Sequence, residues 1–163
     1  MGAPDLVAAT QAALDAGVTV ALVEQPYRVA GRRSPAPAAQ LDEAWIATVA
    51  QLRAGELAGL PLLTGGRSSG ARVACRTAAE TGAAGVLCLA FPLQPPGRAS
   101  APSRLPELDA VGVPTLVVQG ERDPFGMPPG SAMRTVVPVP GDHSLRSAAP
   151  VREAVRAWLP RLL

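Results

Sequence analysis

The chain has 163 residues, a length that predicts one folded domain spanning residues 1–163. Hydrophobic residues make up 48% of the sequence and aromatic residues only 3%, so its core must consist mainly of alanine, valine and leucine side chains. The net charge of +2 comes without a basic stripe interleaved with aromatic residues, which argues against nucleic acid as a partner.

The cysteine count and the ends of the chain exclude further classes of protein. Cys75 and Cys88 fall on a predicted helix and a predicted strand, where we expect buried free thiols in a reducing compartment. One histidine and two cysteines give no metal-ligand spacing, so we expect neither a metal nor another cofactor. The sequence contains no signal-peptide pattern and no apolar stretch of membrane-spanning length, which predicts a cytoplasmic protein without a membrane partner.

Helical and strand-like patterns alternate along the chain. Apolar residues at helical spacing predict helices at 5–16, 41–54, 69–80 and 151–162. Apolar, β-branched runs predict strands at 18–23, 60–64, 85–91, 115–119 and 135–139. Such alternation predicts a three-layer α/β/α sandwich around a mostly parallel sheet. The proline-rich connector at 92–106 is too short to hold a cap domain, and the stretch after Gly126 leaves little room for a helix before the last strand.

The boundary between the strand at 60–64 and the helix at 69–80 carries the pattern Gly66-x-Ser68-x-Gly70. A strand that turns sharply into a helix needs small residues two positions before and after its central residue. The central Ser68 would then project from the edge of the sheet, and the backbone amide of Ser69 could donate to an oxyanion. The pattern therefore predicts a nucleophile elbow.

An acid and the only histidine follow later strands. Asp123 comes after the strand at 115–119, and His143 after the strand at 135–139, so the order is serine, acid, histidine. Because ligands bind at the carboxyl edge of parallel strands, we expect these groups to meet there. The imidazole would accept the Ser68 proton, and Asp123 would orient the imidazole. Glu121 is the alternative acid, whereas Asp142 is expected to shape the turn.

At these motifs the chain resembles small, dienelactone-hydrolase-like α/β-hydrolases related to the hydrolase-like domain of the nonspecific lethal complex subunit three and its testis-expressed relatives. The resemblance runs from near residue 3 to the end, and it implies Ser68 as nucleophile, His143 as base and Asp123 as orienting acid. The residues that carry it are Gln25-Pro26-Tyr27-Arg28, Gly65-Gly66-Arg67-Ser68-Ser69-Gly70-Ala71-Arg72, Gln119-Gly120-Glu121-Arg122-Asp123-Pro124-Phe125-Gly126 and Pro140-Gly141-Asp142-His143-Ser144.

The resemblance also implies an N-terminally shortened α/β-hydrolase fold. Such proteins begin with a strand and a His-Gly-rich loop that supplies a second oxyanion donor, and here only Met1-Gly2-Ala3 precedes the first helix. That strand lies between the counterparts of 18–23 and 60–64, so either these two pair directly or the sheet has a gap. Either the recorded start is internal to a longer gene product, or the protein is a shortened and inactive version.

Three functions are compatible with these patterns. The first is an esterase-like serine hydrolase whose small ester or related acyl substrate is bound and cleaved through Ser68, Asp123 and His143. The second is a non-catalytic interaction module with the same fold. The third is a phosphate- or nucleotide-binding domain using Gly65–Gly70, which lacks the lysine of a phosphate loop. We expect a small-molecule substrate, and the sequence leaves the oligomeric state open.

Overall fold

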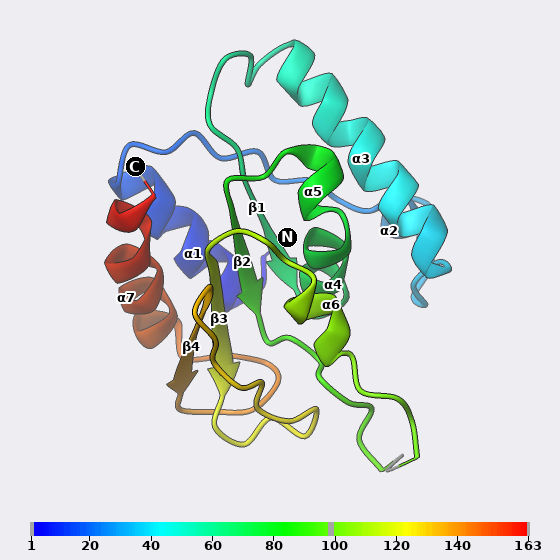
Figure 1. Cartoon of the computed structure of the whole chain (residues 1–163), viewed down its shortest axis with the longest axis vertical. Coiled ribbons are helices and arrows are strands. Elements are labelled where there is room, and N and C mark those ends of the chain that lie inside the picture. The colour runs from blue at the N-terminus through cyan, green and yellow to red at the C-terminus, as the bar shows by residue number, and fades with distance from the viewer. Residues whose placement is uncertain (1, 98–99, 163) are drawn as a thin grey trace.

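A computed structural model describes residues 2–97 and 100–162. The four strands of its sheet are all parallel and lie in the order of the sequence, with helices on both faces (Figure 1). The strands are β1 (Leu63–Arg67), β2 (Gly85–Leu89), β3 (Thr115–Gly120) and β4 (Arg134–Val139). The helices are α1 (Pro4–Asp15), α2 (Pro26–Val29), α3 (Ala38–Ala54), α4 (Ser69–Arg76), α5 (Ala78–Thr81), α6 (Leu105–Asp109) and α7 (Ala148–Trp158), and α7 continues into a 3₁₀ turn, Leu159–Arg161.

Alternating side chains of the sheet build two separate cores. Leu116 and Val118 of β3 point to the face covered by α1 and α7, whereas Val117 between them points to the face covered by α4 and α6. Successive residues of a strand face opposite sides, so a strand covered by helices on both faces is buried along its whole length. All six residues of β3 are buried, as this arrangement requires. The predicted three-layer architecture is confirmed.

Most predicted elements are present with shifted boundaries. The predicted strand at 60–64 is found at 63–67, because Gly65 and Gly66 continue the strand instead of ending it and pair with Leu87 and Cys88. The predicted helix at 69–80 is two helices, α4 and α5, that meet at Thr77. The short helices α2 and α6 were not predicted, and α6 begins inside the proline-rich connector at 92–106. No cap domain is present in the described part of the chain, as predicted, and none of its helices is long and apolar enough to cross a bilayer.

The predicted strand at 18–23 is wrong. This stretch is a coil that leads from α1 to α2 (Figure 1), and within residues 2–97 and 100–162 no backbone–backbone hydrogen bond involves residues 19–23. A strand needs a hydrogen-bonded neighbour, and β1 is an edge strand of the described sheet. Residues 18–23 and β1 therefore do not pair directly, and in the described sheet no strand lies on the open side of β1. A mainly apolar groove of about 520 Å³ lies there, lined by residues of α1, α3, β1 and the coil.

The two cysteines are buried free thiols, as predicted, with 3.5 Å between the sulfur atoms of Cys75 and Cys88. The hydrogen bond shared with Cys75 and burial both favour the protonated thiol of Cys88 and raise its pKa well above the usual range. We therefore expect neither thiol of the folded protein to react with iodoacetamide near neutral pH, and both to react after unfolding in guanidinium chloride. Mass spectrometry of the two samples measures this, and rapid modification of the native protein would contradict the buried positions.

Candidate active site

A strained turn carries Ser68 between β1 and α4. Its φ of 52° and ψ of −113° lie in a region that residues with a β-carbon rarely adopt. The chain can turn this tightly because a β-carbon on Gly66 would lie only 2.5 Å from the carbonyl carbon of Gly70. The end of β1 and the start of α4 thus approach each other at the two glycines on either side of Ser68. This is the geometry predicted for a nucleophile elbow.

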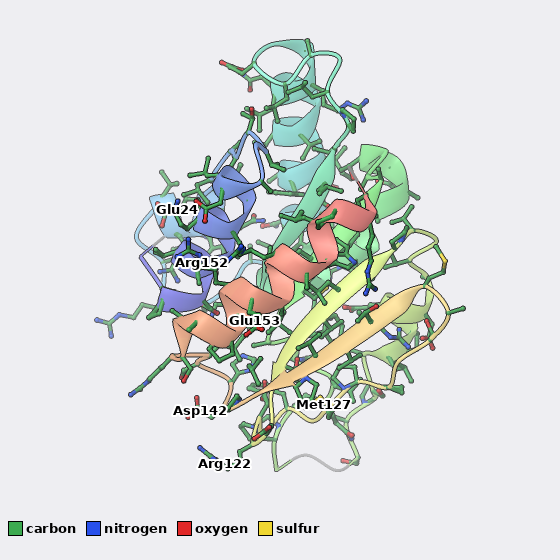
Figure 2. The ribbon with its side chains drawn as sticks, turned by 90° about the vertical axis from the view of Figure 1, so that its left-hand side faces the viewer. Glu24, Arg122, Met127, Asp142, Arg152 and Glu153 are labelled. Atoms are coloured by element: carbon green, nitrogen blue, oxygen red, sulfur yellow. The ribbon has the colours of Figure 1, made fainter. Side chains whose placement is uncertain are left out.

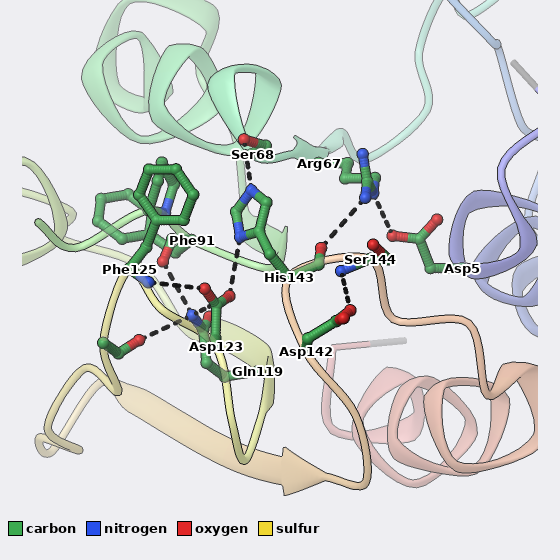
Figure 3. A network of polar contacts seen from close by, with 12 residues as sticks. Asp5, Arg67, Ser68, Phe91, Gln119, Asp123, Phe125, Asp142, His143 and Ser144 are labelled. Carbon is green, nitrogen blue, oxygen red and sulfur yellow. Dashed lines mark hydrogen bonds and ion pairs between the residues drawn. The ribbon is translucent and has the colours of Figure 1, made fainter. Parts of the chain in front are cut away.

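The three side chains expected to act together are in contact at the carboxyl edge of the sheet (Figure 3). The Nε2 atom of His143 lies 2.9 Å from the Oγ atom of Ser68, and the Nδ1 atom lies 2.8 Å from the Oδ2 atom of Asp123. Positions 68, 123 and 143 are brought together because the loops after β1, β3 and β4 all leave the same edge. The arrangement can pass a proton from the serine to the imidazole.

Asp123 is held as a hydrogen-bond acceptor. Its side chain has no exposed surface, and its Oδ1 atom accepts a 2.9 Å hydrogen bond from the backbone amide of Phe125. Its Oδ2 atom accepts from the side-chain amide of Gln119 at 2.8 Å as well as from His143. A buried carboxylate needs hydrogen-bond donors for both oxygens, and these contacts hold Asp123 in place to orient a histidine.

Three neighbours fix the loop that carries His143. A β-carbon on Gly120 would overlap the carbonyl oxygen of Asp142, so the glycine at the end of β3 lets this loop pass close by. The ring of Phe125 packs on the imidazole with 4.4 Å between the ring centres. Arg67 donates from Nη2 to the carbonyl oxygen of His143 at 3.1 Å. The imidazole side chain is 20% exposed, so it is anchored yet within reach of a substrate.

The other two acids are not in this contact chain. Glu121 is exposed, and the structure brings Asp123 to the histidine instead. Asp142 is exposed at the surface beyond β4 (Figure 2), where its Oδ1 atom accepts from the backbone amide of Ser144 at 2.8 Å. This hydrogen bond lowers the pKa of Asp142 below its usual value. Its role in shaping the turn is therefore as predicted.

Ser69 is the first residue of α4, as the sequence predicted. The first amides of a helix have no acceptor within the helix, and they lie at the positive end of its dipole. The Ser69 amide is therefore able to donate to an anion beside Ser68. Ahead of α1, the structure describes only Gly2 and Ala3.

Two supporting interactions were not predicted from the sequence. Gln119 is fully buried near the end of β3, and a long polar side chain directly after the apolar run Leu116-Val117-Val118 is the signal that could have revealed it. Arg67 also donates from Nε to the buried carboxylate of Asp5 at 2.7 Å, which joins α1 to the elbow (Figure 3). No local pattern connects these two residues, which are 62 positions apart.

Comparisons with known proteins agree with the observed fold. Residues 3–149 match the family model described as an alpha/beta hydrolase domain. No curated protein sequence matches the chain. A lidless α/β serine hydrolase from Xanthomonas campestris shares the fold with a TM-score of 0.73 and 21% identity, over 100% of this chain and 75% of that one.

Two further solved structures share the fold. One is an α/β serine hydrolase homologue from Coxiella burnetii, with a TM-score of 0.67 and 18% identity over 96% of this chain and 76% of that one. The other belongs to a report on two metagenome-derived lipolytic enzymes, with a TM-score of 0.69 and 16% identity over 97% of this chain and 89% of that one. The closer relation to the nonspecific lethal complex subunit stays a prediction. The chain belongs to the α/β-hydrolase domain family.

Proposed function

We propose that the protein is a serine hydrolase in which Ser68 is the nucleophile, His143 the general base and Asp123 the orienting acid. The observation that carries this proposal is the continuous contact from the Ser68 hydroxyl through both ring nitrogens of His143 to a buried carboxylate. A serine hydroxyl is a weak nucleophile until a neutral imidazole takes its proton during attack, and this arrangement supplies that imidazole.

The proposed reaction proceeds in two halves. The Ser68 oxygen attacks the ester carbonyl carbon while its proton moves to Nε2 of His143, and the carbonyl oxygen becomes an oxyanion that accepts from the Ser69 amide. The imidazolium then gives its proton to the alcohol oxygen as the ester bond breaks, which leaves an acyl group on Ser68. Water attacks this acyl group, and the same proton transfers release the acid and restore the serine.

We propose a small ester or related acyl compound as the substrate. The described part of the chain contains no cap domain over the elbow, so nothing equivalent encloses a long substrate. One structural neighbour comes from a report on two lipolytic enzymes, and this supports ester chemistry. The findings do not favour the non-catalytic interaction module, and a test of Ser68 reactivity separates it from the enzyme.

Covalent labelling by a fluorophosphonate tests the proposal directly. We expect the folded protein to be labelled on Ser68, and Ser68→Ala to abolish the labelling, because the probe reacts only with an activated serine. Ser131→Ala, which changes an exposed serine away from the elbow, should leave the labelling intact. Intact-protein mass spectrometry gives the readout. Folded protein that stays unlabelled, or that is labelled equally in Ser68→Ala, would favour the interaction module.

A further inference from the structure

Gln119 lies behind the proposed catalytic acid and is completely buried. Its Nε2 atom is 2.8 Å from the Oδ2 atom of Asp123, 3.0 Å from the carbonyl oxygen of Phe91 and 2.9 Å from that of Gly126 (Figure 3). Each of these three neighbours is an acceptor. If the amide were reversed, its oxygen would face all three, so the contacts allow only the orientation in which Gln119 donates.

The oxygen of the Gln119 amide shows that the side chain acts as a hydrogen-bond donor. Within residues 2–97 and 100–162, the Oε1 atom of Gln119 is buried and has no hydrogen-bond partner. A buried acceptor without a partner is unfavourable, so the position is not explained by a fully satisfied polar core. What the residue supplies is its two N–H donors, which are shared among three acceptors: the carboxylate of Asp123 and the carbonyl oxygens of Phe91 and Gly126.

We infer that Gln119 is a positioning residue that fixes Asp123 and limits how strongly its Oδ2 atom attracts the imidazole proton. The inference relies on the proposed function for its catalytic meaning. Gln119 and His143 Nδ1 share the same carboxylate oxygen, so each donor weakens the pull of that oxygen on the other. The other oxygen is occupied by the Phe125 amide, which leaves Gln119 as the side chain that sets the orientation of the carboxylate.

The charged groups around the histidine are few. Asp123 faces its ring, the Arg67 guanidinium faces its carbonyl oxygen, Asp5 lies behind Arg67, and Asp142 precedes it in the chain. Replacing Gln119 by an apolar residue changes none of these charges. A change in the titration of His143 would therefore come from the lost hydrogen bond to Asp123.

Proton NMR of the imidazole tests the inference, and the signals need no assignment because the chain has one histidine. In Gln119→Met we expect the titration midpoint of the imidazole to rise by about one pH unit, since an Oδ2 atom without its second donor stabilises the imidazolium more strongly. Gln94→Met is the control, because it makes the same chemical change at a glutamine whose amide donates to the carbonyl oxygen of Ala101. An unchanged or lowered midpoint in Gln119→Met would overturn the inference.

Gln119→Glu provides the conservative replacement and keeps the test open if Gln119→Met does not fold. Surrounded by three oxygens, the introduced carboxyl group should stay protonated at neutral pH and donate to Asp123. We expect fluorophosphonate labelling of Ser68 at the wild-type rate near pH 7, and a fall at alkaline pH that the wild type lacks. Labelling of folded Gln119→Glu at pH 7 well below the wild-type rate would contradict the inference.

The two proposals fail in different ways. Wild-type protein that folds but is never labelled would end the hydrolase proposal, whereas the NMR titration would still report on Gln119. Wild-type protein that is labelled, together with Gln119 variants whose titration and pH profile match it, would leave the hydrolase and remove the role of Gln119.

Discussion

Replacing Asp123 by asparagine should lower the rate of Ser68 labelling and of p-nitrophenyl acetate hydrolysis by about 10⁴-fold. The carboxylate accepts three hydrogen bonds, from Gln119, Phe125 and His143. Asparagine has one acceptor oxygen, so its amino group must face a donor. If that donor is Nδ1 of His143, the imidazole takes the tautomer with its proton on Nε2 and can no longer accept a proton from Ser68.

Two neighbouring acids are the matched controls for Asp123→Asn. Glu121→Gln and Asp142→Asn make the same chemical change at exposed positions outside the contact chain, so their rates should stay within about threefold of the wild type. Circular dichroism must first show that Asp123→Asn is folded, because the substitution replaces one of the two carboxylate oxygens that accept the buried hydrogen bonds. A large loss of rate in Glu121→Gln together with little loss in Asp123→Asn would show that Asp123 is not the orienting acid.

The positions that form this contact chain could be predicted because each follows a strand of one parallel sheet. Ser68, Asp123 and His143 are far apart in sequence, but parallel strands bring their following loops to one edge. The chemistry of each residue then limits the choice, since the chain has one histidine. Neither step requires knowledge of contacts between distant side chains.

The errors come from features that depend on neighbours in space. The run at 18–23 has the composition of a strand, but composition does not say whether a partner strand lies beside it. In the structure an apolar groove lies beside this run instead. The glycines at 65 and 66 suggest the end of a strand, yet β1 continues through them. A β-carbon on Gly65 would lie 2.7 Å from the carbonyl oxygen of Leu87, so glycine there permits close strand pairing.

Arg67→Met should cost about 3–5 kcal/mol of the free energy of unfolding, because it leaves a buried carboxylate without its cation. Asp5 has no exposed side-chain surface, and Arg67 is the cation that it meets, at 2.7 Å. The same guanidinium holds the carbonyl oxygen of His143. Urea denaturation should therefore show a lower midpoint, and the folded variant should also label Ser68 more slowly, since the histidine loop loses an anchor.

Arg152→Met is the matched control, because Arg152, a residue of α7, forms another ion pair with an aspartate of α1. Its partner is Asp15, and the two side chains are 46% and 36% exposed, so we expect a loss below about 1 kcal/mol. The double variant Asp5→Leu/Arg67→Met should recover most of the stability lost in Arg67→Met, since no buried charge then remains. Because the contact to His143 stays broken, the double variant should still label slowly. Equal destabilisation by Arg67→Met and Arg152→Met would show that burial does not govern the Asp5 pair.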